Sequence, residues 1–376
     1  MYMNKNITIP NNLLPVDGRF GSGPSLVRKS DIEALAELSD SYMGTSHRQA
    51  PVKDMVGRLR DGLSELFTLP NDWEIILGNG GSTLFWDAAT FSLISEKSHH
   101  LVFGEFSSKF AIAANDAPHI GKPFIANSEP GKGPEILESD ADTYAFTHNE
   151  TSTGVSMNLQ RPANTSPDEA ITLVDATSAA GGMVWDPSEV DCYYFAPQKC
   201  FASDGGLWIA ACSPAAIQRI KKISSSKRWI PAGLDLNIAL ENSRKNQTYN
   251  TPALATIFLT VRQIEWMNSN GGLSWAANQS KSLSNHVYDW AENHEFADPF
   301  VTNSSDRSPV VSTIDLTDRV DADEVISICR ENGILDIGGY RKLGRNQLRI
   351  ATFPAIEFTD IQALTASLDF VMEALL

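Results

Sequence analysis

The stretch DCYYFAPQKCFASDGGLWIAAC, residues 191–212, contains one lysine between two short apolar runs. The runs 192–196 and 207–212 flank a polar turn with paired glycines, a pattern that predicts two buried strands. Lys199 lies in this turn, after Pro197 and Gln198. Burying a lysine as a cation is costly. Lys199 is therefore either an ordinary solvated loop residue or a functional amine, and the rest of the chain must distinguish the two.

The segments before this stretch alternate between strand-like and helix-like patterns. Short apolar runs suggest strands at 74–77, 101–103, 144–146 and 171–174, and apolar residues at helical spacing suggest a helix at 84–93. Such βαβ alternation is typical of a mostly parallel sheet that is covered by helices. The sequence therefore predicts an α/β fold for this part of the chain.

The pattern changes near residue 250. Thr251 and Pro252 look like a helix cap and a first-turn proline. Helices at 252–268, 273–292, 322–332 and 359–376 and strands at 310–316 and 348–352 then form an α+β pattern. We expect a large domain at 17–260, a smaller C-terminal domain at 261–376 and an N-terminal arm at 1–16.

Composition narrows the class of protein. The 376 residues carry a formal net charge of −16, which argues against nucleic acid and anionic membranes as partners. The sequence has no apolar run of 18 residues that would predict a membrane span, and residues 1–15 do not resemble a secretory signal. We therefore expect a cytoplasmic protein. The four cysteines show no CxxC spacing and no neighbouring histidine cluster, so we expect no metal site.

Two further motifs follow predicted strands. Residues 78–83, GNGGST, lie between a strand and a helix, where glycines and helix N–H groups can hold an anion. An ordinary strand-to-helix turn would look the same. Asp175 ends the strand ITLVD, at the edge where α/β sheets bind ligands. It could equally be a helix N-cap.

Together, the glycine-rich turn, Asp175 and Lys199 suggest a pyridoxal phosphate site. The lysine amine forms a Schiff base with that cofactor. The carboxylate keeps the pyridine nitrogen protonated, so that the ring can withdraw electrons. The helix start holds the phosphate.

Basic residues cluster at two places in this acidic chain. They occur in GTSHR, residues 44–48, and in YRKLGRNQLR, residues 340–349. Arginine binds carboxylates and phosphate monoesters through two parallel hydrogen bonds. A negatively charged substrate would need such a cluster because the whole protein repels it, although surface charge is the simpler interpretation of Lys342 and Arg345.

The chain resembles the phosphoserine aminotransferases, which are fold-type I pyridoxal phosphate enzymes, and their actinobacterial-type branch most of all. The resemblance covers nearly the whole chain. It rests on FGSGPSLVR, GTSHRQAPVKDMVGR, ILGNGGST, HNETSTG, VDATSAAGG, YYFAPQKCFASDGGLW, KNQTYNTPA and YRKLGRNQLRIATFPA. These stretches contain every motif described above.

The resemblance implies a role for each candidate residue around the cofactor. Lys199 would be the catalytic Schiff-base lysine, and Asp175 would pair with the pyridine nitrogen. Phe106 would stack on the ring, a place where many relatives have tryptophan. The other cofactor-binding residues would be Gly81, Ser82, Thr83, Thr151 and Gln198, together with Asn250 and Thr251 of the second subunit of a homodimer, so that each site requires two chains.

The substrate residues follow in the same way. Arg349 would bind the α-carboxylate of the substrate, and Ser22 would lie near it. His47 and Arg48 would bind the distal acidic group with help from Arg341. The implied reaction is reversible amino transfer from glutamate to 3-phosphohydroxypyruvate, which gives phosphoserine and 2-oxoglutarate in L-serine biosynthesis. Some relatives also act on a four-carbon analogue in pyridoxine biosynthesis, and the sequence leaves this second activity open.

Two other functions remain to be weighed. Another fold-type I enzyme, such as a cysteine desulfurase or a small-amino-acid transaminase, would share the cofactor site. A desulfurase needs a reactive cysteine on a mobile loop, whereas Cys329 lies in a helical pattern and Cys200 follows Lys199. A non-catalytic protein that only binds the cofactor is the third class, and the complete set of Lys199, Asp175 and arginines argues against it.

Overall fold

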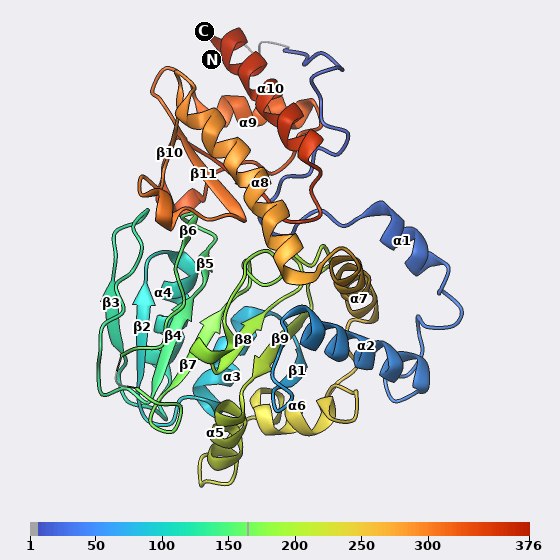
Figure 1. Ribbon diagram of the computed structural model, residues 1–376, viewed down its shortest axis with the longest axis vertical. Coiled ribbons are helices and arrows are strands. Elements are labelled where there is room, and N and C mark those ends of the chain that lie inside the picture. Colours follow the sequence, from blue (N-terminus) through green and yellow to red (C-terminus); the bar gives the residue numbers. More distant parts are fainter. Residues whose placement is uncertain (1–6, 164) are drawn as a thin grey trace.

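The computed structural model describes residues 7–163 and 165–376, so the first six residues of the expected N-terminal arm lie outside the described part (Figure 1). Its largest feature is a seven-stranded sheet with the strand order β1-β9-β8-β7-β4-β2-β3. The strands are β1 (Glu74–Asn79), β2 (Ser98–Val102), β3 (Phe124–Asn127), β4 (Thr143–Thr147), β7 (Ile171–Asp175), β8 (Cys192–Phe195) and β9 (Leu207–Cys212). Strand β9 is antiparallel to both its neighbours, and the other pairs are parallel.

The strands at the centre of this sheet are buried on both faces, as their continuous apolar runs predict. Helices α2 (Ala50–Leu66) and α7 (Leu254–Ser269) contribute to the core on one face. Helices α3 (Ser82–Ser92), α4 (Glu105–Asp116), α5 (Pro214–Ser224) and α6 (Leu236–Ser243) contribute to the core on the other. Tyr193 and Tyr194 of β8 show the alternation, because successive side chains point to opposite faces.

A smaller unit lies beside the large sheet and contains most of the C-terminal part (Figure 1). Its antiparallel sheet has the order β10-β11-β12, with β10 (Ala297–Pro299), β11 (Val311–Leu316) and β12 (Gln347–Ala351). Helices α8 (Gly272–Glu292), α9 (Ala322–Glu331) and α10 (Phe358–Leu375) pack on it. Ile9 and Phe20 from the start of the chain complete this core, so the N-terminal segment is tied to the C-terminal unit.

The predicted α/β fold with a small α+β unit is confirmed, and the predicted strands and helices differ from the observed ones by a few residues at most. Among the described residues, the structure adds four strands to the predicted set. They are the edge strand β3, the short β10, and β5 (Asn149–Glu150) and β6 (Val155–Ser156), which form a small sheet of their own. It also adds helices α2, α4 and α6. Helix α1 (Lys29–Ala36) is where the pattern that starts at Ser30 and Glu33 predicts a helix. The expected boundary at 260/261 falls inside α7 and stays a prediction.

The topology brings several loops to one edge of the large sheet. Strands β1, β2, β4, β7 and β8 run in the same direction, so their carboxyl ends meet at that edge. In open α/β sheets this edge is where ligands bind. Along the described part of the chain, no helix is long and apolar enough to cross a membrane.

Candidate active site

A cavity of about 390 Å³ opens at this carboxyl edge. Its lining includes eight residues that the sequence nominated, namely Gly81, Ser82, Thr83, Phe106, Thr151, Asp175, Gln198 and Lys199. They come from the loops that follow β1, β2, β4, β7 and β8. The parallel arrangement of these strands is the reason that residues more than 100 positions apart share one cavity.

Lys199 lies in the turn after β8, with its Nζ directed at the carbonyl oxygen of Ser22, to which it donates a hydrogen bond. Burial lowers the pKa of this amine to about 8, and the positive charge of Arg349 adds to the effect. The loop over Lys199 favours glycine at position 23, because the backbone φ there is +148° and a Cβ would lie 1.7 Å from Nζ. Lys199 is therefore not a solvated surface lysine but an amine of which about half is neutral near pH 8.

Asp175 ends β7 and is 5% exposed. Its Oδ1 accepts hydrogen bonds from the Thr177 amide at 3.0 Å and the Thr177 hydroxyl at 2.5 Å, and its Oδ2 accepts one from Trp86 Nε1 at 3.0 Å. Burial nevertheless raises the pKa of this carboxyl, against the opposing effect of the hydrogen bonds. Because burial disfavours the charged form of Asp175, a cationic group bound in the cavity would stabilise the carboxylate. The alternative role as a helix N-cap is not what the structure shows, because the next residues form turns.

The predicted phosphate-binding residues surround the start of α3. Gly81 is the N-cap of this helix, and Ser82 and Thr83 form its first turn, where backbone N–H groups have no partner within the helix. The Ser82 hydroxyl lies 2.6 Å from the Thr177 hydroxyl, which links this helix start to Asp175. Gln198 lies on the cavity wall, and its Oε1 is buried without a hydrogen-bond partner among the described residues. This end of the cavity can hold an anion.

Phe106 and Thr151 lie on the cavity wall formed by the start of α4 and the loop after β4. The Phe106 ring contacts Tyr340 of the smaller unit edge-to-face, with 6.0 Å between ring centroids. The Thr151 hydroxyl bonds the Ser178 hydroxyl at 2.8 Å, and the Thr151 carbonyl accepts a hydrogen bond from Arg349 Nη1 at 3.2 Å. This wall thus joins the two structural units.

A second cavity of about 630 Å³ is lined by three predicted substrate residues, Ser22, Arg341 and Arg349, and shares Gly23 and Pro24 with the first. Arg349 Nε and Ser22 Oγ are buried without hydrogen-bond partners among the described residues. Burial lowers the pKa of Arg349, although arginine stays charged at any ordinary pH. A buried guanidinium with an unpaired N–H is suited to a carboxylate ligand.

The remaining predicted residues, His47, Arg48, Asn250 and Thr251, line neither cavity. They form a group of their own in which His47 Nδ1 lies 3.2 Å from Thr251 Oγ1. Arg48, Asn250 and Thr251 are exposed. The predicted cap at Thr251 is wrong, because α7 begins at Leu254 with Ala253 as its N-cap. The Thr251 hydroxyl meets His47 instead of a helix N–H.

Two further basic side chains of the 340–349 segment are already paired. Lys342 Nζ lies 2.5 Å from Glu105 Oε1, and the Arg345 guanidinium bonds the Asp315 carboxylate. Neither contributes an unpaired charge to a substrate. Three basic residues of this segment line the second cavity, namely Arg341, Lys342 and Arg349. Because Lys342 is paired with Glu105, Arg341 and Arg349 are the two that can bind a substrate there.

The structure adds site residues that the sequence reasoning did not nominate. Trp86 and Thr177 line the first cavity and hold Asp175 in place. The position of Thr177 two residues after a strand-ending aspartate was an available signal, because aspartate often accepts from that amide. Trp86 offered none, since an apolar residue on a helix normally reads as core.

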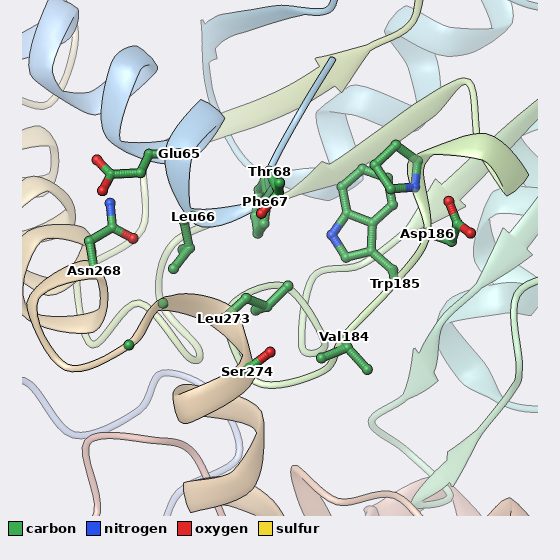
Figure 2. Close-up of a pocket in the computed structure, with 13 residues that line it drawn as sticks. Glu65, Leu66, Phe67, Thr68, Val184, Trp185, Asp186, Asn268, Leu273 and Ser274 are labelled. Carbon is green, nitrogen blue, oxygen red and sulfur yellow. The ribbon is translucent and has the colours of Figure 1, made fainter.

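A larger cavity of about 670 Å³ lies elsewhere, between the end of α2, residues 184–187 and the turn that joins α7 to α8 (Figure 2). Glu65, Trp185 and Leu273 are among its lining residues. None of the predicted site residues, all of which the structure describes, lines this cavity. Size alone therefore does not identify the active site here.

The lowered pKa of Lys199 makes a prediction for the cofactor-free protein. An amine reacts only when it is neutral, and the neutral fraction of a group with a pKa of about 8 rises from roughly a tenth at pH 7 to roughly nine-tenths at pH 9. Acetylation of Lys199 by acetic anhydride, followed by mass spectrometry, should rise with pH and level off above about pH 9. A lysine model peptide in the same tube should keep rising, since its pKa is about 10.4. If Lys199 followed the peptide, the lowered pKa would be refuted.

Comparison with known proteins places the chain in a family. The family model described as "Aminotransferase class-V" matches residues 127–341. A phosphoserine aminotransferase of Nocardioides sp. is 54% identical over 99% of this chain and 100% of its own length. Among solved structures, a phosphoserine aminotransferase from Cytophaga hutchinsonii has a TM-score of 0.84 at 24% identity and covers 94% of this chain and 99% of that one. A pyridoxal phosphate-bound phosphoserine aminotransferase from Trichomonas vaginalis has a TM-score of 0.79 at 20% identity, with 94% and 99% coverage.

The two structural likenesses show the shared fold, and the long, highly identical curated relative narrows the assignment. The segment matched by the family model contains Thr151, Asp175 and Lys199, which meet in the first cavity. This chain belongs to the class-V aminotransferases and, within them, to the phosphoserine aminotransferase family.

Proposed function

We propose that the protein transfers an amino group reversibly from glutamate to 3-phosphohydroxypyruvate, giving phosphoserine and 2-oxoglutarate, with pyridoxal 5'-phosphate as its cofactor. The observation that carries this proposal is the 54% identity to a phosphoserine aminotransferase along the entire chain. The cavity around Lys199 and Asp175 supports the same reaction class. The net charge of −16 explains why the site needs its own arginines to hold acidic substrates.

The residues of the first cavity fit the cofactor. A buried carboxylate with a raised pKa suits a protonated pyridine nitrogen, and the start of α3 suits a phosphate group. When bound, pyridoxal phosphate supplies an electron sink that stabilises negative charge at the substrate Cα. Lys199 would hold the cofactor through Nζ, which bonds as a neutral amine, and the same nitrogen would hold and return the proton of the substrate Cα as the general base and acid. Asp175 keeps the ring nitrogen protonated, and Phe106 covers the ring.

The substrate is held by charge and hydrogen bonds. Arg349 binds the α-carboxylate through the guanidinium N–H that has no partner among residues 7–163 and 165–376, with Ser22 beside it. His47 and Arg48 bind the distal acidic group, and Arg341 assists. His47 and Arg48 lie outside both cavities of their own chain, so we propose that they serve the other active site of a homodimer. Asn250 and Thr251 lie in the same group and would reach the phosphate of that second site.

We propose that the enzyme acts in the cytoplasm, in L-serine biosynthesis. The four-carbon analogue of pyridoxine biosynthesis differs from 3-phosphohydroxypyruvate in the chain that joins the carboxylate to the phosphate. The same Arg349 and His47–Arg48 anchors could bind both only if the site tolerates the longer spacing. Turnover of the two substrates by the same preparation decides this point.

No observation favours the desulfurase alternative. All four cysteines are buried, and burial raises the pKa of the Cys200 and Cys329 thiols. Cys200 contacts the Ser178 carbonyl beneath the cavity, and Cys329 lies in the core of α9. A nucleophilic cysteine needs the opposite environment, with exposure and a lowered pKa.

The first test is the visible absorbance spectrum of the purified protein. Phosphoserine should convert the yellow band of bound cofactor to the pyridoxamine form, whereas alanine at the same concentration should leave it unchanged. The reason is that alanine lacks the second acidic group that His47, Arg48 and Arg341 would bind. A band that responds equally to both amino acids would contradict the proposed substrate, and absence of any band with added pyridoxal phosphate would contradict the cofactor.

A further inference from the structure

Helix α4 begins at the active site, and its first N–H groups point at the loop after β4. The amide of Glu105 donates to Ser152 Oγ at 2.9 Å. The amides of Phe106 and Ser107 donate to Glu150 Oε2 at 3.1 and 2.9 Å. The first N–H groups of a helix lack partners within the helix and carry a partial positive charge, so a carboxylate is their strongest acceptor.

The same carboxylate also holds its own loop. Glu150 Oε1 accepts hydrogen bonds from the Ser152 amide at 3.2 Å and from the Ser152 hydroxyl at 2.7 Å. Its other oxygen lies 2.9 Å from the Ser107 hydroxyl. The side chain is fully buried, with 0% of its surface exposed. Two segments that are more than 40 residues apart in the sequence are therefore joined through one buried carboxyl group.

The approach of the two segments is close enough to require a glycine. A Cβ at Gly104, the N-cap of α4, would lie 2.3 Å from Glu150 Cγ and 2.6 Å from Ser152 Oγ. Glu150 thus packs directly against the turn into the helix. The contact is tightly packed as well as hydrogen-bonded.

Both joined segments form walls of the site. Phe106, whose own amide donates to Glu150, lines the first cavity from the side of α4. Thr151, next to Glu150, lines it from the other side and holds Arg349 through its carbonyl oxygen at 3.2 Å. The position of Glu150 therefore determines how far the aromatic wall lies from the residue that orients the substrate-binding arginine.

We propose that Glu150 is a positioning residue for amino transfer, whose buried carboxylate sets the spacing between Phe106 and the Thr151–Arg349 pair. It touches neither cofactor nor substrate and acts through these three residues. The inference rests on the proposed function, because Phe106 and Arg349 matter to the reaction only if the cavities bind the cofactor and an amino acid.

The geometry predicts that even glutamine cannot replace this carboxylate. Each oxygen of Glu150 faces at least one backbone N–H, from Phe106 and Ser107 on one side and from Ser152 on the other. Glutamine has one carbonyl oxygen and one NH₂ group. In either orientation its NH₂ group would face a backbone N–H that cannot accept a hydrogen bond, and a buried donor left without a partner destabilises the contact.

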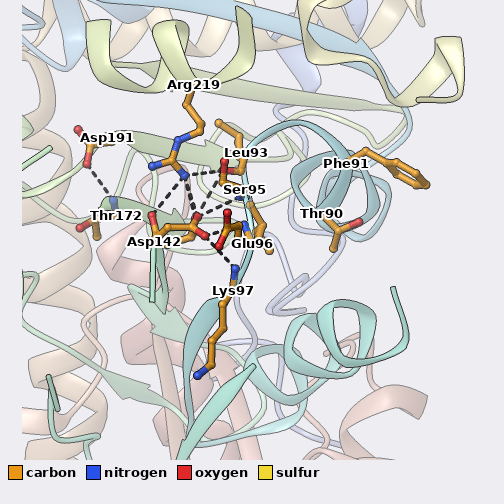
Figure 3. Close-up of polar contacts among 12 residues, drawn as sticks. Thr90, Phe91, Leu93, Ser95, Glu96, Lys97, Asp142, Thr172, Asp191 and Arg219 are labelled. Carbon is orange, nitrogen blue, oxygen red and sulfur yellow. Dashed lines mark hydrogen bonds and ion pairs between the residues drawn. The ribbon is translucent and has the colours of Figure 1, made fainter. Parts of the chain in front are cut away.

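The test compares Glu150→Gln with a matched variant, Asp142→Asn. Asp142 is also a carboxylate that accepts several backbone N–H groups, from Ser95, Glu96 and Lys97, and it bonds Arg219 (Figure 3). It directly precedes β4, so it lies at the amino end of the sheet, away from the cavities. Both variants should lower the thermal midpoint, but only the first should disturb the site.

Three measurements read out the site. In the cofactor-free Glu150→Gln protein, amide hydrogen exchange of residues 105–107 should quicken by about tenfold, as expected for the loss of roughly 1.4 kcal/mol of local protection. The dissociation constant for pyridoxal phosphate, titrated by absorbance, should rise by a similar factor. The KM for phosphoserine should rise more than kcat falls, since Arg349 binds the substrate before the chemical step. Asp142→Asn should leave all three at wild-type values.

The proposal would be overturned by wild-type exchange, cofactor affinity and KM in Glu150→Gln, or by equal changes in both variants. If Glu150→Gln does not fold, Ser152→Ala removes one arm of the same contact and should shift the three readouts in the same direction by a smaller factor. Unchanged readouts in a folded Ser152→Ala protein would then count against the proposal. A wild-type protein that ignores phosphoserine would contradict the proposed function alone, because exchange and cofactor affinity would still test Glu150.

Discussion

Replacing Lys199 by alanine is expected to reduce the rate of amino transfer by at least about 10³-fold, because the variant loses both the nucleophile and the proton carrier. Lys199 is the one lysine among the described residues that line the first cavity. The measurement is steady-state turnover of phosphoserine and 2-oxoglutarate by purified wild-type and variant protein.

The variant should keep its fold. Removing an amine whose pKa burial lowers to about 8 removes a group that is costly to charge at pH 7, so the thermal midpoint of the cofactor-free variant should not fall. Lys97→Ala is the control, because Lys97 pairs with Asp140 at the opposite edge of the sheet and should not affect turnover. Turnover near the wild-type value in Lys199→Ala would refute the assignment of the catalytic residue.

The lowered pKa of Lys199 also sets the direction in which the stability of the cofactor-free protein changes with pH. The folded-state pKa of Lys199 lies below the value of about 10.4 in an unfolded chain, so the unfolded protein binds more protons between the two values. The stability of the cofactor-free protein should therefore gain a contribution as pH rises from about 8 towards 10. This contribution should vanish in Lys199→Ala.

Asp175→Asn is expected to have the second largest effect, a loss of about 10²–10⁴-fold in kcat, the usual range for a group that controls protonation in the transition state. The ring nitrogen loses the anion that keeps it protonated, and the amide NH₂ group of asparagine would face the N–H donors of Thr177 or Trp86. The measurement is the rate at which phosphoserine decreases the absorbance band of the bound cofactor in a single turnover, alongside kcat in the steady state.

Asp191→Asn is the matched control for this variant. Asp191 is equally buried, accepts a hydrogen bond from the Thr172 amide and pairs with Arg161. It directly precedes β8 and so lies at the amino end of the sheet, so its loss should lower stability and leave kcat within a few-fold of wild type. A kcat in Asp175→Asn no lower than in the control would show that Asp175 only supports the fold.

The proposed pair of Lys199 and Asp175 could be predicted from the sequence because its signals are local. Asp175 ends an apolar strand and Lys199 follows the next one, and consecutive strands of a parallel sheet are commonly neighbours, with their carboxyl ends at one edge. The buried strands were accessible for the same reason, since a short apolar run that is bounded by turn residues specifies its own environment. Each of these inferences needed only the residues within one element or its turn.

The supporting residues were not accessible, because their roles depend on partners far away in the chain. Trp86 is 89 positions from the Asp175 carboxylate that it holds, and Glu150 is 43 positions from the Ser107 amide. The cap expected at Thr251 failed because the hydroxyl found His47, which is 204 positions away. A local pattern cannot show which of several possible hydrogen bonds a side chain will make.

The sequence by itself therefore determined the fold class and nominated the residues that we propose carry the chemistry, because strand burial, turn residues and the Lys199 and Asp175 positions are properties of short segments. The tertiary structure alone decided the pKa of Lys199, the hydrogen bonds of Asp175 and the position of Glu150 between two cavity walls. The physical reason is that burial and hydrogen-bond geometry arise only when distant segments pack together, and these two quantities set the charge and orientation of a side chain.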